Sequence, residues 1–250
     1  MNENRTTTWN LSGRVALITG ASRGIGAACA EAMVQAGAHV IAVARSQNDL
    51  KLLAEKSGNG IEIWVEDISK NSFRERVEKL NCLDILFNNA GMNAPQPFVD
   101  LQEKTLDEMI ALNVRALFLT AQSAVKVMSR SNKGGSIINM SSQMGHIGAQ
   151  NRTAYCMTKH AVEGLTKALG VELAPQGIRV NSVAPTFIDT PMTEPMFEDK
   201  EFKQWALDCI PMGRIGQLRE VVSAVMFLAS TDSSLMTGAS LKIDGGWTAR

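Results

Sequence analysis

Short apolar runs alternate with longer segments of mixed polarity along most of the chain. The runs are apolar at nearly every position, which is typical of strands in a parallel sheet that helices cover on both faces. The predicted strands span residues 14–19, 40–44, 61–65, 83–87, 136–140, 178–183 and 240–243. Because crossovers between parallel strands are right-handed, this order predicts an α/β protein with a doubly wound parallel sheet of about seven strands.

The segments between these strands have the length of helices. The predicted helices span residues 24–36, 47–56, 70–80, 105–130, 152–174 and 217–229. Residues 1–12 read as a short polar arm, and no repeat or interdomain linker follows, so one domain over 1–250 is expected. Residues 186–216 are irregular, with three prolines that break a helical pattern near 199–208. Because this segment follows the sixth strand, it is expected to overhang the ligand site as a substrate-binding lid.

Composition excludes several classes of function. The 250 residues include 25 basic and 25 acidic ones, so neither a nucleic-acid partner nor an anionic membrane surface is expected. No apolar run approaches the ~20 residues of a membrane span, and the N-terminus lacks the pattern of a signal peptide. Four scattered cysteines and three histidines form no metal-binding pattern. Together these features predict a cytoplasmic protein without a metal.

A glycine-rich turn at residues 19–26, TGASRGIG, follows the first predicted strand and opens into the first predicted helix. Strand, glycine turn and helix is the layout of a dinucleotide-binding βαβ unit. Gly20 allows a tight turn, Gly24 lets the backbone approach a pyrophosphate, and Gly26 lets the helix pack on the sheet. The helix N-terminus offers free N–H groups to the phosphates. The alternative is a glycine turn in an α/β protein of another kind.

A tyrosine and a lysine stand four positions apart in a predicted helix, at Tyr155 and Lys159, and therefore share a helix face. A free tyrosine titrates near ~10. A neighbouring ammonium group favours the phenolate, so Lys159 is expected to lower the pKa of Tyr155. The pair then predicts a group that exchanges a proton with a carbonyl or an alcohol. A partly buried tyrosine beside a solvated lysine is the alternative.

Further motifs lie at matching positions: NNAG at 88–91, LNV at 112–114, SS at 141–142, RVNSVAP at 179–185 and DGG at 244–246. With TGASRGIG and Y-x-x-x-K, their order and spacing resemble the short-chain dehydrogenase/reductase family over nearly the whole chain. The resemblance implies a single-domain Rossmann-type fold. It also implies an NAD(P)-dependent oxidoreductase that acts on CH–OH groups, exchanging a hydride between NADP(H) and a secondary alcohol or ketone.

The resemblance also implies four catalytic residues. Tyr155 would exchange the proton with the substrate oxygen, and Lys159 would lower its pKa and hold the nicotinamide ribose. Ser142 would donate a hydrogen bond to the substrate oxygen. Its neighbour Ser141 is the rival, although the thirteen-residue spacing to Tyr155 favours Ser142. Asn113 would hold a water that connects Lys159 to solvent, and it could also mark a kink in its helix.

Cofactor-binding residues follow from the same resemblance. They are Gly20, Ser22, Arg23, Gly24, Ile25, Gly26, Arg45, Asp67, Ile68, Asn89, Ala90, Gly91, Tyr155, Lys159, Pro185, Ile188 and Thr190. Asp67 resembles the carboxylate that accepts from the adenine amino group, with a helix cap as its alternative role. Relatives mostly have Pro-Gly where this chain has Pro185-Thr186. A β-branched residue resists positive φ, so the backbone or the substrate pocket is expected to differ there.

The end of the second strand predicts the choice of cofactor. NAD enzymes usually place an acid there for the adenosine ribose, whereas this chain has Arg45 and no carboxylate before Asp49. Arg45, with Arg23 as a second candidate, suits a 2′-phosphate because arginine pairs with phosphate in a bidentate fork. NADP(H) is therefore predicted as the preferred cofactor, with NAD(H) possible.

The substrate is less well determined by the sequence. Candidate lining residues are Gln143, Met144, His146, Asn151, Met192, Met196 and Trp205. His146 is expected to be a rim or core histidine rather than an additional acid. The polar and apolar mixture suits a small hydroxylated ketone, a polyol, a sugar or a cyclic ketone, and does not exclude a bulky apolar one. The alternatives are a 3-oxoacyl carrier-protein reductase and a non-catalytic protein that senses NADP.

The resemblance finally implies a homotetramer. One two-fold axis would pair the helices at 105–130 and 152–174, and another would pair the helix at 217–229 with the last strand. The last helix carries more apolar residues than one face needs. These residues are Val221, Val222, Val225, Met226 and Leu228.

Overall fold

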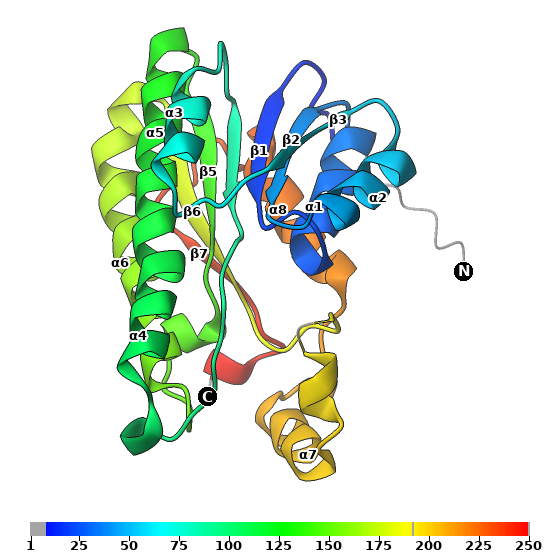
Figure 1. The fold of residues 1–250 in the computed structure, drawn as a ribbon, viewed down its shortest axis with the longest axis vertical. Coiled ribbons are helices and arrows are strands. Elements are labelled where there is room, and N and C mark those ends of the chain that lie inside the picture. Colours follow the sequence, from blue (N-terminus) through cyan, green and yellow to red (C-terminus); the bar gives the residue numbers. More distant parts are fainter. Residues whose placement is uncertain (1–8, 192, 250) are drawn as a thin grey trace.

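The computed structural model describes residues 9–191 and 193–249 and contains one parallel sheet in the order β3-β2-β1-β4-β5-β6-β7 (Figure 1). The strands are β1 (Val15–Thr19), β2 (His39–Ala44), β3 (Ile61–Val65), β4 (Ile85–Asn88), β5 (Gly135–Met140), β6 (Ile178–Pro185) and β7 (Ser240–Ile243). All strands are parallel, but the order in which successive strands are added to the sheet reverses between β1 and β4. Ala16 of β1 pairs with Val40 of β2 on one side and with Ile85 of β4 on the other. The doubly wound sheet predicted from the sequence is confirmed, and its switch point lies beside the glycine turn.

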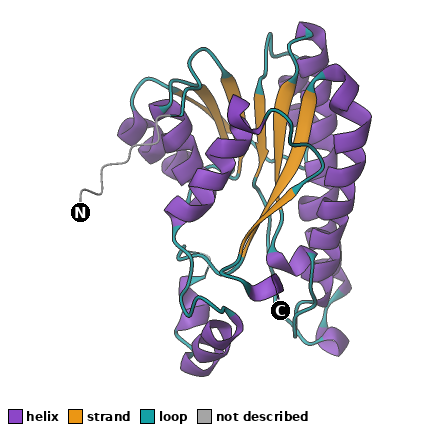
Figure 2. Cartoon of the chain, turned by 180° about the vertical axis from the view of Figure 1, so that it is seen from behind, coloured by secondary structure: helices purple, strands orange, loops and turns teal. Residues whose placement is uncertain are grey.

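Two helical layers enclose this sheet (Figures 1 and 2). One layer contains α1 (Gly24–Gln35), α2 (Gln47–Ser57) and α8 (Leu218–Ala229), and the other contains α3 (Asn71–Glu78), α4 (Glu103–Ile110), α5 (Leu117–Ser131) and α6 (Thr153–Leu173). Each layer has its own apolar core against one face of the sheet. Burial on both faces explains why the strands carry almost no polar positions.

The fourth strand begins two residues later than predicted, because Asp84 has another role. Its carboxylate accepts hydrogen bonds from the backbone N–H of Val15 and from Arg14 Nη1, each at 2.9 Å. Asp84 therefore ties the start of β1 to the start of β4, and regular pairing begins at Ile85.

The predicted helix at 105–130 is continuous over Glu103–Ser131 but contains a π-helical turn at Ala111–Ala116. By length and apolar composition alone this helix could cross a membrane. In the fold it packs against α3, α6 and the sheet. A π-helical turn re-aims side chains and is common at functional sites, and this one contains Asn113.

The last helix, α8, has less exposed apolar surface than the sequence predicts. Val221, Val225, Met226 and Leu228 are buried in the core of their own chain. Of the five residues assigned to excess apolar surface, Val222 alone is partly exposed. Large exposed apolar side chains instead lie on α5 and α6, at Phe118, Met157 and Val171.

The predicted lid protrudes from the carboxyl-end edge of the sheet and contains α7 (Lys200–Cys209) (Figure 1). Its first residue, Thr186, donates a backbone hydrogen bond to the carbonyl of Ile243 at 3.1 Å. Among the described non-glycine residues, positive φ occurs at Asn132 and Asn151 and not at Thr186. A threonine is accommodated after Pro185 because the backbone does not turn left-handed there.

Candidate active site

The glycine turn between β1 and α1 disfavours a side chain at each of its three glycines. Gly20 and Gly24 have φ of +65° and +58°, which side chains disfavour. A Cβ on Gly26 would lie 2.3 Å from the carbonyl oxygen of Gly20. A Cβ on Gly20 would lie 2.9 Å from Ala90 Cα. The backbone of α1 therefore begins against a bare turn, with its N–H groups accessible to a phosphate.

Thr19 and Asn89 hold this turn in place. Thr19 Oγ1 accepts hydrogen bonds from the backbone N–H groups of Asn89 at 3.0 Å and Ala90 at 3.1 Å. Asn89 Nδ2 donates to the carbonyls of Thr19 and Gly20, each at 3.0 Å. The ends of β1 and β4 are thus joined beneath the turn. The sequence gives no sign of this role of Thr19 beyond its place before Gly20.

These residues fit a dinucleotide. The turn presents open backbone, and its far side lies next to Thr190, whose Cβ would be 3.9 Å from a Cβ on Gly24. Thr190 is fixed in turn by Thr193, whose Oγ1 accepts from the Thr190 N–H at 3.1 Å. The glycine turn and the start of the lid therefore enclose the space where a pyrophosphate would meet the helix N-terminus.

Two charged residues, Arg45 and Asp67, lie just after the carboxyl ends of β2 and β3. Arg45 is exposed, and its charge acts on Asp67. Burial alone would raise the pKa of Asp67, but hydrogen bonds from Ser69 and the charges of Lys70 and Arg45 outweigh it and lower that pKa. Asp67 Oδ1 accepts from the Ser69 N–H at 2.9 Å, so it closes a turn before α3. Asp67 does not cap α3, whose N-cap residue is Lys70, and the Ser69 side chain also hydrogen-bonds to its carboxylate.

Tyr155 and Lys159 lie on α6 beside the end of β5. Lys159 Nζ donates to the Met140 carbonyl at 2.8 Å and lies 5.5 Å from the centroid of the Tyr155 ring. Burial lowers the pKa of Lys159 to about 8, although the charge of Glu163 opposes this shift. Burial likewise raises the pKa of Tyr155 to about 12, while a hydrogen bond from Ser142 lowers it. Burial therefore determines the direction of the shift, and the expected lowering of the Tyr155 pKa by Lys159 is not found.

The two serines after β5 have different surroundings. Ser142 is hydrogen-bonded to the Tyr155 phenol, and its Oγ also accepts from the Met144 N–H at 3.1 Å. Ser141 Oγ is buried without a hydrogen-bond partner among the described residues. A Cβ on Gly145 would lie 2.8 Å from it. The geometry thus brings Ser142, and not Ser141, to the tyrosine.

Asn113 lies within the π-helical turn and faces the same group. Its Nδ2 donates to Thr158 Oγ1 at 3.2 Å, and both its amide atoms bond to the backbone of Met92. A Cβ on Gly91 would lie 3.2 Å from Asn113 Oδ1 and 3.7 Å from Lys159 Nζ. Gly91 therefore leaves the space through which the amide and the ammonium face each other. Thr158 and Met92 were not found from the sequence.

A buried polar cluster lies one helical turn beyond Lys159. Glu163 accepts from Ser182 Oγ at 3.0 Å and from Ser240 Oγ at 3.1 Å. His146 Nε2 lies 3.3 Å from Glu163 Oε1 and 3.0 Å from Ser240 Oγ. His146 is thus paired within the fold, as the core-histidine alternative expects.

The remaining predicted residues are spread around the same edge of the sheet. Gln143 and Met144 are buried, Asn151 is exposed, and Met196 is partly buried in the lid. Met192 lies outside the described residues. Pro185 ends β6, and Ile188 is buried and bridges to Gly216. Ser22 and Arg23 lie within the glycine turn, and Ile25 lies in the first turn of α1. Ile68, which follows Asp67 in the sequence, is buried.

Aromatic side chains join the lid to the sheet. Phe187 packs edge-on against Phe202 with ring centroids 5.5 Å apart, and Trp205 packs on Trp247 at 5.6 Å. Phe187, Phe202 and Trp247 belong to a third apolar cluster, which also contains Tyr155 and Cys156. Of these four residues, Trp205 alone was predicted from the sequence. Phe187 and Phe202 lie in the predicted lid itself, and Trp247, after β7, meets Phe187 only in three dimensions.

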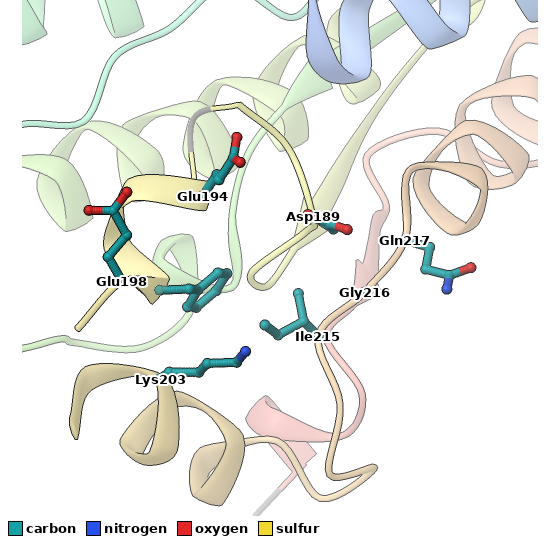
Figure 3. Close-up of a pocket in the computed structure, with 8 residues that line it drawn as sticks. Asp189, Glu194, Glu198, Lys203, Ile215, Gly216 and Gln217 are labelled. Carbon is teal, nitrogen blue, oxygen red and sulfur yellow. The ribbon is translucent and has the colours of Figure 1, made fainter. Parts of the chain in front are cut away.

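A cavity of about 390 Å³ lies where the lid joins the fold (Figure 3). Its walls come from the segment after β6, from α7 and from the start of α8. The charged lining residues are Asp189, Glu194, Glu198 and Lys203. Three acids against one base make this side of the lid negative.

Known proteins similar to this chain agree with the geometry. A family model described as "Enoyl-(Acyl carrier protein) reductase" matches residues 20–248. L-xylulose reductase of Bos taurus is 36% identical over 96% of this chain and 98% of its own length. The 3-oxoacyl-(acyl-carrier-protein) reductase FabG of Thermotoga maritima is 40% identical over 94% and 98%. A solved gluconate 5-dehydrogenase of Burkholderia cenocepacia, in complex with NADP and tartrate, has a TM-score of 0.91 at 31% identity and covers 97% of this chain and 98% of its own.

A Rossmann-type sheet with a phosphate-accepting turn and a tyrosine, serine and lysine at one edge defines a nicotinamide-dependent oxidoreductase. The chain belongs to the short-chain dehydrogenase/reductase family. It is an oxidoreductase that acts on CH–OH groups or the corresponding carbonyls, with NAD(P)(H) supplying or accepting the hydride.

Proposed function

We propose that this protein is an NADP(H)-dependent reductase that interconverts a ketone and a secondary alcohol of a small sugar, polyol or cyclic substrate. The observation that carries the proposal is the hydrogen bond between Ser142 and the Tyr155 phenol, with the Lys159 ammonium beside the same ring. A protonated phenol, a hydroxyl donor and a cation then meet at one point, which suits a carbonyl oxygen that gains a proton.

Each residue has a separate task. Tyr155 gives its proton to the ketone oxygen, and a pKa of about 12 keeps the phenol protonated at neutral pH. Ser142 donates to the same oxygen as negative charge develops on it. Lys159 supplies positive charge behind the tyrosine, and Asn113 fixes the backbone at Met92 beside it.

NADP(H) is preferred over NAD(H). Arg45 lies exposed at the end of β2 beside Asp67, and Arg23 is exposed at the start of α1. A guanidinium at either place can pair with an adenosine 2′-phosphate, which NAD(H) lacks.

The substrate class is inferred from the lining and the relatives together. Buried polar groups, Gln143 and Ser142 among them, stand beside the aromatic wall of the lid. Such a mixture suits a small hydroxylated ketone. Among the relatives are an L-xylulose reductase and a gluconate 5-dehydrogenase. The second candidate is a 3-oxoacyl carrier-protein reductase, which the 40% identity to FabG favours.

We further propose that residues 1–250 act as one domain in which segment 186–216 closes over the substrate.

The exposed apolar side chains of Phe118, Met157 and Val171 on α5 and α6 support pairing of subunits in a homotetramer. Four free thiols, one of them exposed, suit a cytoplasmic location. Sedimentation of a single 27.0 kDa species at working concentration would contradict the tetramer.

The experiment that tests the function follows NADPH and NADH consumption with a panel of sugars, cyclic ketones and free oxo esters. The reverse reaction is measured with polyols. We expect NADPH to be consumed with at least one hydroxylated or cyclic ketone. Tight binding of NADPH without consumption by any carbonyl would favour a cofactor sensor instead.

A further inference from the structure

An arginine is buried beside the catalytic tyrosine without an acid to pair with it. Arg152 directly precedes α6, three positions before Tyr155, and only 8% of it is exposed. Its Nη1 donates to the carbonyl of Asn151 at a long 3.3 Å. Its Nε is buried and has no hydrogen-bond partner in the part of the chain that the structure describes. The ion pairs found among the described residues do not include Arg152.

This arrangement is costly unless something else supplies the negative charge. A buried guanidinium that is neither paired nor fully hydrogen-bonded loses its hydration without compensation. The charge also acts on the reacting end of the site, since it lowers the pKa of Tyr155. Burial lowers the pKa of Arg152 itself, yet arginine stays protonated at any working pH. The cation is therefore permanent and close to the tyrosine.

Other buried polar atoms without partners gather around the same site. Besides Arg152 Nε they are Asn93 Oδ1, Gln96 Oε1 and Thr186 Oγ1, so these are four of the seven such atoms among the described residues. The other three residues follow the carboxyl ends of β4 or β6. The loop after β4 reaches Arg152, because the Gln96 N–H donates to the Asn151 carbonyl at 3.1 Å. Unpartnered buried groups in native proteins require an explanation, and a bound polar ligand supplies one.

We propose that Arg152 binds an anionic group of the substrate, a carboxylate, so that the preferred substrate is a hydroxylated keto acid rather than a neutral ketose. The inference rests on the proposed function and specifies its substrate class. A carboxylate would satisfy the fork of the guanidinium, and hydroxyl groups along the substrate would meet the unpartnered amide and hydroxyl oxygens. A carboxylate there also lies near the N-terminus of α6, whose partial positive charge favours an anion.

The test compares two ketones that differ in one group. 5-Keto-D-gluconate and L-sorbose share the same carbon skeleton and hydroxyl configuration, and a hydroxymethyl group in L-sorbose replaces the carboxylate. We expect the wild type to have at least about tenfold higher kcat/KM for the keto acid. Arg152→Gln should lose at least about tenfold on the keto acid and less than about threefold on L-sorbose. Arg152→Lys should retain part of the selectivity.

Arg179→Gln is the matched control. Arg179 is partly buried, but it donates to Ser233 Oγ at 2.7 Å and to two backbone carbonyls near the amino ends of the strands. Its loss should lower stability and leave the ratio of the two kcat/KM values unchanged. Calorimetric titration of the wild type with D-gluconate and D-glucitol gives a readout without turnover and without a variant. D-gluconate should bind at least about tenfold more tightly.

Three outcomes overturn the role of Arg152. The first is a wild type that reduces L-sorbose or a neutral cyclic ketone as well as the keto acid. The second is an equal loss of Arg152→Gln on both ketones, which would mean that the arginine acts only through Tyr155. The third is equal binding of D-gluconate and D-glucitol, which would follow if an acid of the lid such as Glu194 pairs with Arg152. If none of the carbonyls tested supports NADPH consumption by the wild type, the proposed function itself fails.

Discussion

Asn113 brackets the peptide backbone of Met92 with both ends of its side-chain amide. Its Oδ1 accepts from the Met92 N–H at 2.8 Å, and its Nδ2 donates to the Met92 carbonyl at 2.8 Å. This pair fastens the loop after β4 to the π-helical turn. The same amide lies across Gly91 from Lys159, so the position of that loop and the surroundings of the ammonium are set together.

Replacing the amide by a carboxylate should break this arrangement. In Asn113→Asp the nitrogen donor is lost and a carboxylate oxygen faces the Met92 carbonyl, which leaves a buried charge unpaired. We expect kcat to fall at least about tenfold and the free energy of unfolding to fall by about 1–3 kcal/mol. Asn59→Asp, at an exposed position, is the control. Unchanged turnover in Asn113→Asp would show that turnover does not depend on this amide.

Tyr155 is the single tyrosine of the chain, which allows a direct measurement. We expect the ultraviolet titration of its phenolate to show a pKa of about 12 in the protein without cofactor. Tyr155→Phe removes the proton that must move, so turnover should fall at least about 10²-fold, the scale of a positioned acid. NADPH affinity should change little. A variant with near-normal turnover would show that another group donates the proton.

The buried Lys159 predicts a pH dependence of stability. Its pKa is about 8 in the folded protein against 10.5 for the ordinary group. The unfolded chain therefore binds more protons between these values, and stability rises as pH increases through this range. Relative to Lys159→Met, the wild type should gain about 2 kcal/mol in the free energy of unfolding between pH 8 and pH 10. Urea denaturation at both pH values measures the difference, and a flat difference contradicts the shift.

Arg45 should distinguish the two cofactors. Arg45→Ala removes a charge-assisted contact that is worth roughly 1.5–3 kcal/mol to a phosphate. We therefore expect NADPH affinity to fall about tenfold or more while NADH affinity stays nearly constant. Lys104→Ala removes an exposed cation on the opposite helical layer and serves as the control. Equal losses for NADPH and NADH would mean that Arg45 does not bind the 2′-phosphate.

Most of the fold was predictable from the sequence, because burial on both faces leaves a strong signal in each strand. All seven predicted strands occur in the structure. The start of β4 was missed because Asp84 acts through contacts with Arg14 and Val15, which are distant in sequence. The π-helical turn around Asn113 was not predictable from periodicity, since its residues continue the helical pattern on both sides.

The candidate site was predictable only where a motif of fixed spacing carries it. Ser142, Tyr155 and Lys159 were found in this way. The direction of the Tyr155 pKa shift was not, because it depends on how deeply the phenol is buried. Arg152 carried one signal that was overlooked: it lies three positions before Tyr155 in the helix predicted at 152–174, and residues three apart share a helix face.

The acidity of the lid bears on the remaining choice between a free ketone and an acyl group on a carrier protein. Residues 193–208 contain five acids against two bases, a net charge of minus three, and all five acids are exposed. Lys133, a basic residue outside the lid, lies two residues before the start of β5 and so at the edge of the sheet opposite the site. Carrier proteins are acidic, so we expect the lid to repel them.

Specificity constants for a 3-oxoacyl carrier protein and for free ketones should therefore differ, most strongly at low salt, where charge repulsion acts over a longer distance. We expect the free ketones to be the better substrates. Reversing an exposed lid charge that does not line the cavity, Glu201→Lys, should raise kcat/KM for the carrier-bound substrate and leave that for neutral free ketones nearly constant, because the effect is on encounter and not on chemistry. Lys133→Glu is the matched reversal at the far edge of the sheet and should change neither. A tenfold preference of the wild type for the carrier-bound substrate would instead assign the enzyme to fatty-acid synthesis.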